Sequence, residues 1–325
     1  MALLYLLLGA HVLISAGTYV IAKYGLAEIG PLTFAVLRFS LSASFVTLLT
    51  VLMGRLVFPA RRDLPALVLL GFVGYPLNQL LFLIGITQAP PVHAALLYSF
   101  TPIAVLIIAR LTIGEPITPP KVGGILLALS GAYLVLMEPA WRQGVDGLAE
   151  MVARTAQVFQ LTSSAIQGDL IILAGVMAWS FYTVLGKPLI QRYGTLSTTA
   201  FAQLIGLAMI IPVTVVVMWA LPQLRSPFIF PLPALGVERL DPAAISPLAW
   251  TSLAYLGILT SGGAYLIWYF LIRRLDTTKV AVSINLQPAA TVALSYLFWQ
   301  REPFTPIFFL GLALAGLGVY MTQRG

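Results

Sequence analysis

The feature that most restricts the fold of this chain is a hydrophobic unit of five apolar runs that occurs twice. Gly71 and Pro102 recur 186 positions later as Gly257 and Pro288. Four further residues recur 187 positions later. They are Glu115, Gly124, Gly131 and Tyr133, which recur as Glu302, Gly311, Gly318 and Tyr320 in that order. A repeat of this size indicates one structural unit used twice. Because five is odd, the second unit enters a membrane from the opposite face, and inverted halves of this kind are typical of secondary transporters.

Composition places the repeated unit in a membrane. Only 9% of residues are charged and 59% are hydrophobic, and the mean hydropathy is +0.95, which leaves too little polar surface for a water-soluble protein. A helix needs about 20 apolar residues to cross the hydrocarbon core. Ten such runs can be marked, at 3–24, 31–53, 64–87, 92–113, 121–138, 169–190, 196–219, 247–272, 278–298 and 304–323. We therefore predict an all-α membrane protein with ten transmembrane helices in two inverted five-helix repeats.

The repeats are predicted to occupy residues 1–138 and 169–325, with a linker at 139–168. Within the linker, apolar residues at helical spacing predict a short amphipathic helix on the bilayer surface; they are Leu148, Met151, Val152, Thr155 and Phe159. The second repeat contains a loop at 221–247 whose six prolines exclude a continuous helix. Both segments are interpreted as connectors on the outer face, in preference to a binding role.

The basic residues predict the orientation. Eleven Lys and Arg residues fall on the face that holds both termini, six fall on the other face, and Arg38 lies inside a span. Because basic loops face the cytoplasm, both termini are expected there. The net charge of +7 is explained by the same loops and by anionic lipid, so we expect no nucleic-acid partner. With no Cys and two His, no metal site and no cofactor are expected.

The first helix carries a polar stripe, because His11, Ser15, Tyr19 and Lys23 follow one another at intervals of four residues. Ser15 and Tyr19 are candidates for substrate binding, or they form hydrogen bonds between helices. His11 is a candidate proton carrier or charge contact, although a histidine satisfied by a neighbouring helix is favoured. Lys23 is expected to extend to the interface.

Other polar groups at membrane depth accompany prolines. Asn78 and Gln79 follow Pro76, and Tyr98 and Ser99 precede Pro102. In the equivalent helix of the second repeat, Ser283 and Asn285 precede Pro288. Helices weakened at matching positions of two repeats point to a transport site, so these polar residues are predicted to bind substrate and Pro102 and Pro288 to act in gating. The alternative is that Pro and small polar residues only allow close helix packing.

Aromatic residues form a second candidate layer, with Trp179 and Tyr182 in the sixth span and Tyr265 and Trp268 in the eighth. They are interpreted either as a cavity wall or as residues of the interfacial belt. No Asp or Glu lies in the middle of a span, which disfavours a cation carrier. Arg38 lies seven residues into the second span, about 10 Å deep at helical rise. It is a possible contact for a substrate carboxylate, or it holds its helix to a neighbour or reaches the outer headgroups.

These residues together resemble the drug/metabolite transporter superfamily, and in particular its EamA-type members with ten helices. The resemblance is carried by Trp179 eight positions before Lys187, by Pro31 followed by Arg38, by the Pro102 and Pro288 helices, and by the pairs Glu115–Pro116 and Glu302–Pro303. The chain departs from the pattern where Ser15 replaces a common Trp. The resemblance implies an export or exchange carrier for small metabolites, often amino acids, in a bacterial inner membrane. It also implies that helices one, three, four, six, eight and nine form the cavity, whose candidate lining is Ser15, Tyr19, Asn78, Tyr98, Trp179, Tyr182, Tyr265, Trp268, Ser283 and Asn285.

The function expected from the sequence is therefore alternating-access transport of a small neutral or zwitterionic solute. The alternatives are a channel-like facilitator and an intramembrane enzyme. The enzyme is disfavoured because the chain offers no catalytic cluster of carboxylates, His or activated Ser. A stripe of Gly311, Ala315 and Gly318 fits packing either within one bundle or between two chains, so we expect a monomer or a weak homodimer.

Overall fold

A computed structural model describes residues 2–89, 91–141, 148–158, 163–220, 245–299 and 304–325 of the chain. All regular structure in these ranges is helical, and ten segments are long and apolar enough to cross a membrane. The prediction of an all-α protein with ten spans is confirmed. Prolines 222, 227, 231, 233 and 242 of the predicted outer loop, with Phe159 and Glu302, lie outside the described residues.

Five spans form the first repeat. They are α1 (Ala2–Leu26), α2 (Pro31–Leu52), a third span of η1 (Arg61–Asp63), α3 (Leu64–Phe72), η2 (Val73–Leu77) and α4 (Asn78–Gln88), a fourth of α5 (Pro91–Ser99) and α6 (Thr101–Thr112), and α7 (Pro119–Trp141). The linker contains α8 (Leu148–Val158). The second repeat has α9 (Ser163–Tyr193), α10 (Thr195–Ala220), an eighth span of α11 (Pro247–Ala254), η3 (Tyr255–Ala264) and α12 (Tyr265–Ile272), a ninth of α13 (Thr277–Ala281), η4 (Val282–Leu286) and α14 (Gln287–Trp299), and α15 (Pro306–Arg324).

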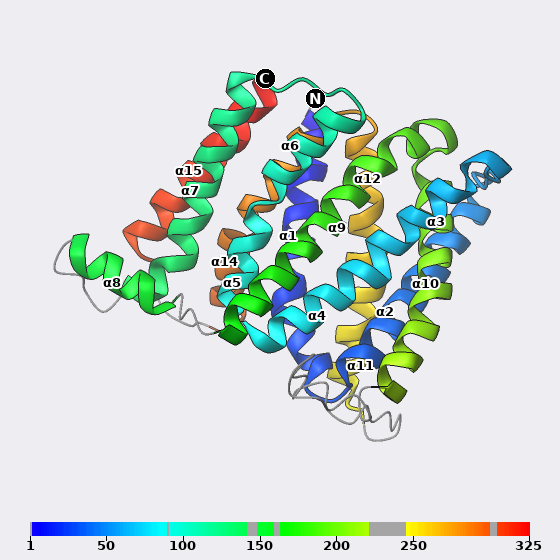
Figure 1. The fold of residues 1–325 in the computed structure, drawn as a ribbon, viewed down its shortest axis with the longest axis horizontal. Helices are drawn as coiled ribbons and strands as arrows, with labels where there is room; N and C mark the ends of the chain where they lie inside the picture. The colour runs from blue at the N-terminus through cyan, green and yellow to red at the C-terminus, as the bar shows by residue number, and fades with distance from the viewer. Residues whose placement is uncertain (1, 90, 142–147, 159–162, 221–244, 300–303) are drawn as a thin grey trace.

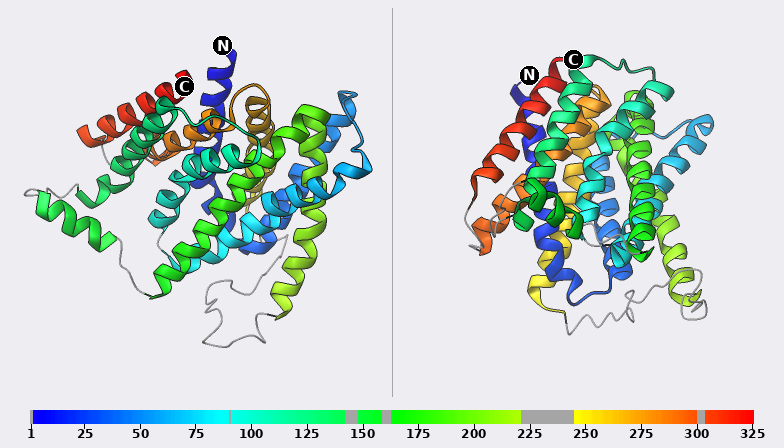
Figure 2. Two further views of the ribbon diagram at one scale, coloured as in Figure 1. Left: turned by 45° about the horizontal axis from the view of Figure 1, so that its top comes forward. Right: turned by 60° about the vertical axis from the view of Figure 1, so that its left-hand side comes forward.

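The two repeats are inverted relative to each other. Both chain termini lie at one end of the bundle, which we call the termini end (Figure 1). Helix α1 runs from the termini end to the opposite end, whereas its counterpart α9 runs from the opposite end to the termini end (Figures 1 and 2). The repeats also interlock, because α2 packs on α10 and η3, α4 packs on α9, and α1 packs on α14.

The last helices of the repeats, α7 and α15, pack against each other along glycines (Figure 1). A Cβ added to Gly131 would collide with the backbone of Gly311 and Ala315, and one added to Gly318 would collide with the backbone of Gly124. The backbones therefore approach more closely than side chains would allow. The small-residue stripe of α15 is occupied by its own bundle, so it is not available to hold a second chain.

Four spans are irregular, and they form two repeat-equivalent pairs. Pro76 lies inside the π-helical segment η2, and the eighth span contains the longer π-helical segment η3. The fourth span breaks at Phe100, just before Pro102, and the ninth contains the 3₁₀ segment η4 just before Pro288. Proline has no N–H to continue the α-helical hydrogen bonds, and π segments often occur at functional sites. The third, fourth, eighth and ninth spans are thus locally weakened in both repeats.

The linker helix α8 contacts α7 (Figure 1). Its Met151 and Val158 pack against a cluster that includes Tyr133 and Trp141, so part of its apolar face rests on protein. The placement of α8 on the bilayer surface and the division of the chain at residues 138 and 169 stay predictions.

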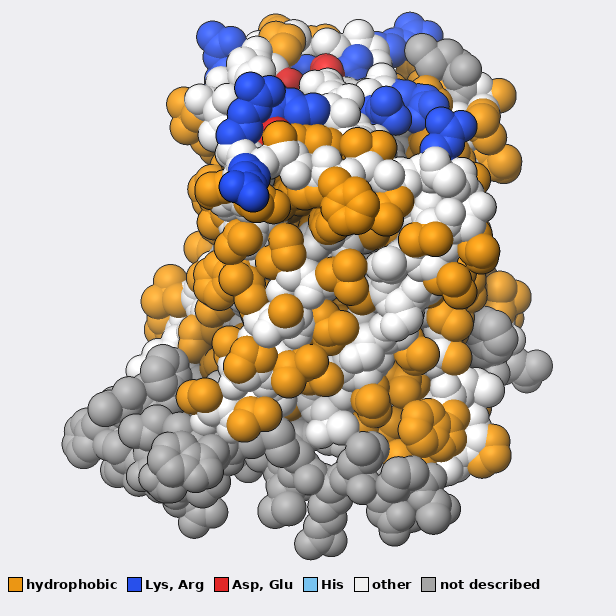
Figure 3. Space-filling view, turned by 90° about the vertical axis from the view of Figure 1, so that its right-hand side faces the viewer, with side chains coloured by type: hydrophobic (Ala, Val, Ile, Leu, Met, Phe, Trp, Pro, Cys, Tyr) orange, Lys and Arg blue, Asp and Glu red, His pale blue; other side chains and the backbone are white. Residues whose placement is uncertain are grey.

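The outside of the bundle has the pattern of a membrane protein. Figure 3 shows the face over α2, α3 and α10, where Lys and Arg side chains gather near the termini end above a broad hydrophobic band. Exposed apolar residues of α2, α3 and α10 include Leu48, Leu69 and Val215. An apolar band bounded by cations is the surface that a bilayer requires.

Candidate functional site

The centre of the bundle is filled by an aromatic core contributed by both repeats. It consists of Tyr75 on η2, Tyr182 on α9, and Trp268 and Tyr269 on α12, which are 0%, 1%, 0% and 0% exposed. The hydroxyls of Tyr75 and Tyr182 share a 2.9 Å hydrogen bond, and the rings of Tyr182 and Tyr269 stack at 4.9 Å. Buried phenols need such partners. The aromatic core therefore closes this level of the bundle with satisfied polar groups.

Trp179 and Tyr265 extend this aromatic core but are only half-buried. Their ring centroids lie 5.2 Å apart, and Trp179 lies 5.3 Å from Tyr182. Trp179, Tyr182, Tyr265 and Trp268, all expected from the sequence to line a site, are thus brought together. Tyr182 and Trp268 contribute the buried floor, whereas Trp179 and Tyr265 retain accessible surface.

We infer an open space beside Tyr19 within the protein, from the exposure of its side chain and its place on α1. Its side chain is 50% exposed, although it lies two helical turns after the buried Val12 and on the same side of α1. Tyr19 is also within electrostatic range of Arg38 on α2 and Tyr265 on α12. Exposure on a side of the helix that also carries buried residues is expected if the interior nearby is open.

Asn78 joins three helices beside this space. Its Nδ2 donates to the Tyr98 hydroxyl at 3.0 Å and to the Gly175 carbonyl at 2.9 Å. The amide thereby fixes α4, α5 and α9 relative to one another. The adjacent Gln79 is half-buried and makes no hydrogen bond to the residues that the structure describes, so its amide stays available.

Three other predicted site residues use their polar groups within the protein. Ser99 Oγ donates to the Ala95 carbonyl at 2.9 Å, and Ser283 Oγ donates to the Val280 carbonyl at 2.7 Å. Asn285 donates to the Ser99 carbonyl at 2.9 Å when its amide is oriented to suit its neighbours. The first two bonds lie within their own spans, whereas the bond from Asn285 links η4 to α5 close to Pro102 and Pro288.

His11 and Ser15 lie one turn apart on α1. Ser15 Oγ lies 3.4 Å from His11 Nε2, and the buried imidazole packs on Trp268 with ring centroids 4.7 Å apart. The Nδ1 atom of His11 has no hydrogen-bond partner among the described residues. His11 therefore forms part of the wall beneath Ser15 and Tyr19.

Arg38 is held by a chain of hydrogen bonds between repeats. Its Nε donates to Ser261 Oγ on η3 at 2.6 Å. The Ser261 carbonyl accepts from Gln203 Nε2 on α10 at 2.7 Å, and Gln203 Oε1 accepts from Ser42 Oγ at 2.9 Å. We refer to Arg38, Ser261 and Gln203, with the nearby Tyr19 and Tyr265, as the Arg38 site.

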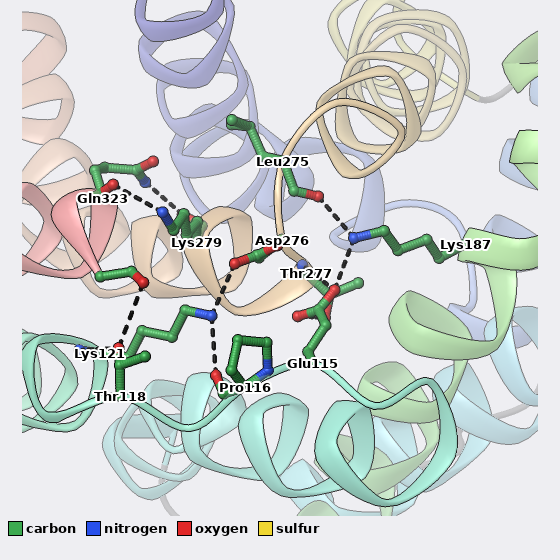
Figure 4. A network of polar contacts seen from close by, with 11 residues as sticks. Glu115, Pro116, Thr118, Lys121, Lys187, Leu275, Asp276, Thr277, Lys279 and Gln323 are labelled. Carbon is green, nitrogen blue, oxygen red and sulfur yellow. Dashed lines mark hydrogen bonds and ion pairs between the residues drawn. The ribbon is translucent and has the colours of Figure 1, made fainter.

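A second polar assembly closes the termini end (Figure 4). We call it the termini-end charge network, and it consists of Glu115, Lys121, Lys187, Asp276, Thr277, Lys279 and Gln323. Lys187 Nζ on α9 lies 2.7 Å from Glu115 Oε1, and Thr277 donates to Glu115 from its N–H and its hydroxyl, each at 2.9 Å. Lys121 Nζ lies 2.8 Å from Asp276 Oδ2. Both ion pairs join the first repeat to the second.

Sequence reasoning missed several of these residues. Gln203 is a polar residue in the middle of a span and satisfies the criterion that selected Asn78. His93 is buried, its Nδ1 lies 3.0 Å from Asp169, and its Nε2 lies 3.0 Å from the Val158 carbonyl. Only the structure shows that this pair links α5, α8 and α9. Within the described residues, no three His, Cys, Asp or Glu side chains are grouped to hold a metal ion.

A separate pocket of about 410 Å³ opens between α1 and α11. It is lined mainly by apolar groups of Val20, Ile21, Tyr24, Leu248 and Tyr255. Its wall offers few hydrogen-bonding groups for a polar solute, so the Arg38 site is the stronger candidate.

Curated proteins resemble the chain along nearly its whole length. An uncharacterized transporter of Bacillus subtilis, YyaM, is 26% identical, with 99% of this chain and 93% of the relative covered. A probable amino-acid metabolite efflux pump of Escherichia coli is 24% identical over 94% and 90% of the two chains. A probable terminal-alkyne amino-acid exporter of Streptantibioticus cattleyicolor is 26% identical over 82% and 75%.

Structure and family comparison agree with these relatives. A protein of known crystal structure matches with a TM-score of 0.73 at 18% identity, covering 100% of this chain and 97% of the other, which supports the fold. The model of the EamA-like transporter family matches residues 2–137 and 166–324, once for each repeat. The sequence-based resemblance is therefore confirmed, and this family is one of transporters and not of enzymes. The chain is a ten-span membrane protein that belongs to the EamA-like transporter family.

Proposed function

We propose that this protein is a secondary transporter that moves small polar metabolites, either amino acids or related compounds, by alternating access. The observation that carries the proposal is a contrast in exposure at the interface of the repeats. Tyr19 is 50% exposed on the inward side of α1, whereas Trp268 and Tyr269 are 0% exposed. An accessible site next to a fully buried aromatic core is the arrangement expected of a carrier that is open to one side of the membrane only.

The closed side is the termini end. The aromatic core blocks the centre, and beyond it the termini-end charge network joins α9 and the α12–α13 turn to the α6–α7 loop (Figure 4). Opening this side requires the bond between Lys187 and Glu115 to break. In the proposed cycle, the weakened third, fourth, eighth and ninth spans bend near Pro102 and Pro288 to open the termini end and to close the opposite end.

The proposed location is the cytoplasmic membrane, with both termini in the cytoplasm. The basic residues near the termini end support this orientation (Figure 3). The accessible site then faces outward in the described conformation. The names of the two exporters among the relatives support export or exchange as the direction.

The Arg38 site and its neighbours are proposed to bind the substrate. Ser15, Tyr19, Asn78, Gln79 and Tyr98 supply hydroxyls and amides on the first repeat. Trp179 and Tyr265 supply apolar faces with polar edges on the second. Ser99, Ser283 and Asn285 are proposed to join the site only when the fourth and ninth spans move.

The test uses the purified full chain in liposomes with a panel of labelled amino acids and related metabolites. We expect saturable flux that unlabelled compounds of the same class compete for. The matched variant pair is Tyr98→Phe, which removes a hydroxyl at the site, and Tyr5→Phe, which removes one from the exposed Tyr5. Only the first is expected to lower the flux.

Absence of saturable flux for the whole panel would count against transport of this substrate class. Single-channel currents, or flux that rises in proportion to concentration without a limit, would indicate a pore in place of a carrier.

A further inference from the structure

We propose that Arg38 is an anion-binding subsite of the transport site and that the transported solute therefore carries a carboxylate. This inference rests on the proposed transport function and names a chemical group that the substrate must have. It excludes solutes that lack a carboxylate, such as amino-acid amides and simple amines, as good substrates.

The first step is that the charge of Arg38 is not neutralised. An arginine keeps its charge in proteins, yet no carboxylate pairs with Arg38 in the described part of the chain. Its one hydrogen bond to a described residue is from Nε to the neutral hydroxyl of Ser261. Both Nη groups, which carry four of the five N–H donors, remain without a hydrogen-bond acceptor in the described residues.

The second step is the depth of Arg38. It lies seven residues after Pro31, where α2 begins, and its side chain is only partly accessible. Charged groups inside a membrane are costly, and they are usually paired or face a watered pathway. The protein retains a cation at a place where the described residues offer no counterion, which is the expected arrangement if a ligand supplies the negative charge.

The third step is that the guanidinium is held in place. Ser261 lies in the π-helical segment η3, its carbonyl accepts from Gln203, and Gln203 in turn accepts from Ser42 on the same helix as Arg38. This series of hydrogen bonds begins and ends on α2 and passes through η3 and α10. It therefore fixes one edge of the Arg38 guanidinium. The other edge keeps the planar pair of donors that binds a carboxylate in bidentate fashion.

The fourth step is the surroundings of that edge. The hydroxyls of Tyr19 and Tyr265 lie within electrostatic range of Arg38, and Tyr19 borders the accessible space. Phenol hydroxyls donate hydrogen bonds to carboxylates. Trp179, with its ring 5.2 Å from that of Tyr265, offers an adjacent apolar face for the rest of the solute.

The experiment compares wild type with Arg38→Gln, Arg38→Lys and the control Arg274→Gln. Arg274 is exposed, stacks on Phe270 with its Cζ 3.6 Å from the ring centroid, and lies outside the site. The probes are a panel of labelled L-amino acids, their amides and the corresponding decarboxylated amines. For each, flux into liposomes and binding to detergent-solubilised protein by titration calorimetry are both measured, and thermal unfolding checks the fold.

We expect wild type to bind and transport amino acids and to discriminate against the amides and amines. A charge-assisted hydrogen bond contributes about 1.5–3 kcal/mol, so Arg38→Gln should raise the KM and Kd for the carboxylate probes by roughly 10- to 150-fold. The KM and Kd of Arg38→Lys should lie between those of wild type and Arg38→Gln, because lysine keeps the positive charge but lacks the planar pair of donors. Arg274→Gln should match wild type.

Each outcome decides between the claims. If wild type transports an amide or amine as well as its amino acid, or if folded Arg38→Gln keeps wild-type affinity, the anion subsite is refuted while transport stands. Binding of amino acids that depends on Arg38 but comes without flux supports the subsite and refutes the transport proposal. Neither binding nor flux for the whole panel overturns both.

Discussion

The protein buries cations in two places and treats them differently. In the termini-end charge network, Lys121 is 0% exposed but pairs with Asp276, and Lys187 pairs with Glu115 (Figure 4). At the Arg38 site, the guanidinium donates from Nε to one neutral hydroxyl. The network pairs its own charges, whereas we propose that the Arg38 site leaves its charge for the carboxylate of a substrate. Buried charge therefore indicates structure where it is paired and indicates binding where it is not.

Among the substitutions that test this comparison, the largest change in stability is expected at Glu115. Glu115→Ala leaves Lys187 with only the Leu275 carbonyl and leaves two donors of Thr277 without their acceptor. Loss of one partner of a buried ion pair costs about 3–5 kcal/mol. We expect a marked fall in the thermal midpoint of the detergent-purified protein and greater labelling of cysteines engineered at the termini end.

The control is the double variant Glu115→Leu with Lys187→Met. Replacing both members of a buried pair with apolar groups is often neutral, so this variant should recover the part of the thermal midpoint that is lost through the ion pair, but not the part lost because the two Thr277 donors still lack an acceptor. A double variant as unstable as Glu115→Ala would show that the ion pair itself is not the cause.

A smaller effect of opposite sign is expected at Arg38. Arg38→Met removes a desolvated charge but keeps much of the side-chain volume, so it should stabilise the protein by about 0.5–2 kcal/mol, the range of common stabilising substitutions. Thermal unfolding measures the gain, and Arg274→Met is the matched surface control. If Arg38→Met instead unfolds at a lower temperature than wild type, the Arg38 charge is structural and the contrast between the two regions disappears.

The smallest effect is the pH response of Asp276, in the turn between α12 and α13. Burial opposes its ionisation, but the hydrogen bond from Lys121 and the charges of Lys121, Lys187 and Lys279 outweigh burial and hold its pKa below the ordinary 3.8. Because the pKa is lowered, this pair stabilises the fold fully above the ordinary value, and the contribution disappears as the pH falls through the lowered pKa. An exposed or half-exposed pair contributes about 0.2–1 kcal/mol.

The measurement is the difference in thermal midpoint between wild type and Asp276→Asn as a function of pH. The difference should be constant from pH 8 to pH 5 and should shrink below pH 4. A difference that instead changes between pH 5 and pH 8 would assign the titration to another group.

The sequence was sufficient to predict the ten spans and the inversion, because these depend on the lengths of apolar runs and on an odd number of helices in each repeat. It also identified residues that the fold brings together, such as Trp179 and Tyr265. Their roles in binding stay predictions. Periodicity is informative along one helix, since the four-residue interval places Tyr19 on the same stripe as the buried His11.

The contacts between helices could not be predicted in this way. The pairing of Glu115 with Lys187, or of Gln203 with Ser261, depends on the rotation of helices that are apolar on every side, so no hydrophobic face fixes the register. The irregular segment η3 was missed because it contains no proline. It repositions Ser261 toward Arg38, and nothing in the residue spacing indicated this.

The glycine contact between α7 and α15 has a mechanical consequence. Moving one helix along the other by a single residue would drive a Cβ into a backbone carbonyl, as it would at Gly131 and Gly318, so the pair resists translation but permits a change of angle. In the proposed transport cycle, this contact would serve as a hinge line between the two halves at one side of the bundle. The conformational change of transport would then rotate the remaining helices about that line. A cross-link between α7 and α15 is therefore expected to leave the transport rate unchanged.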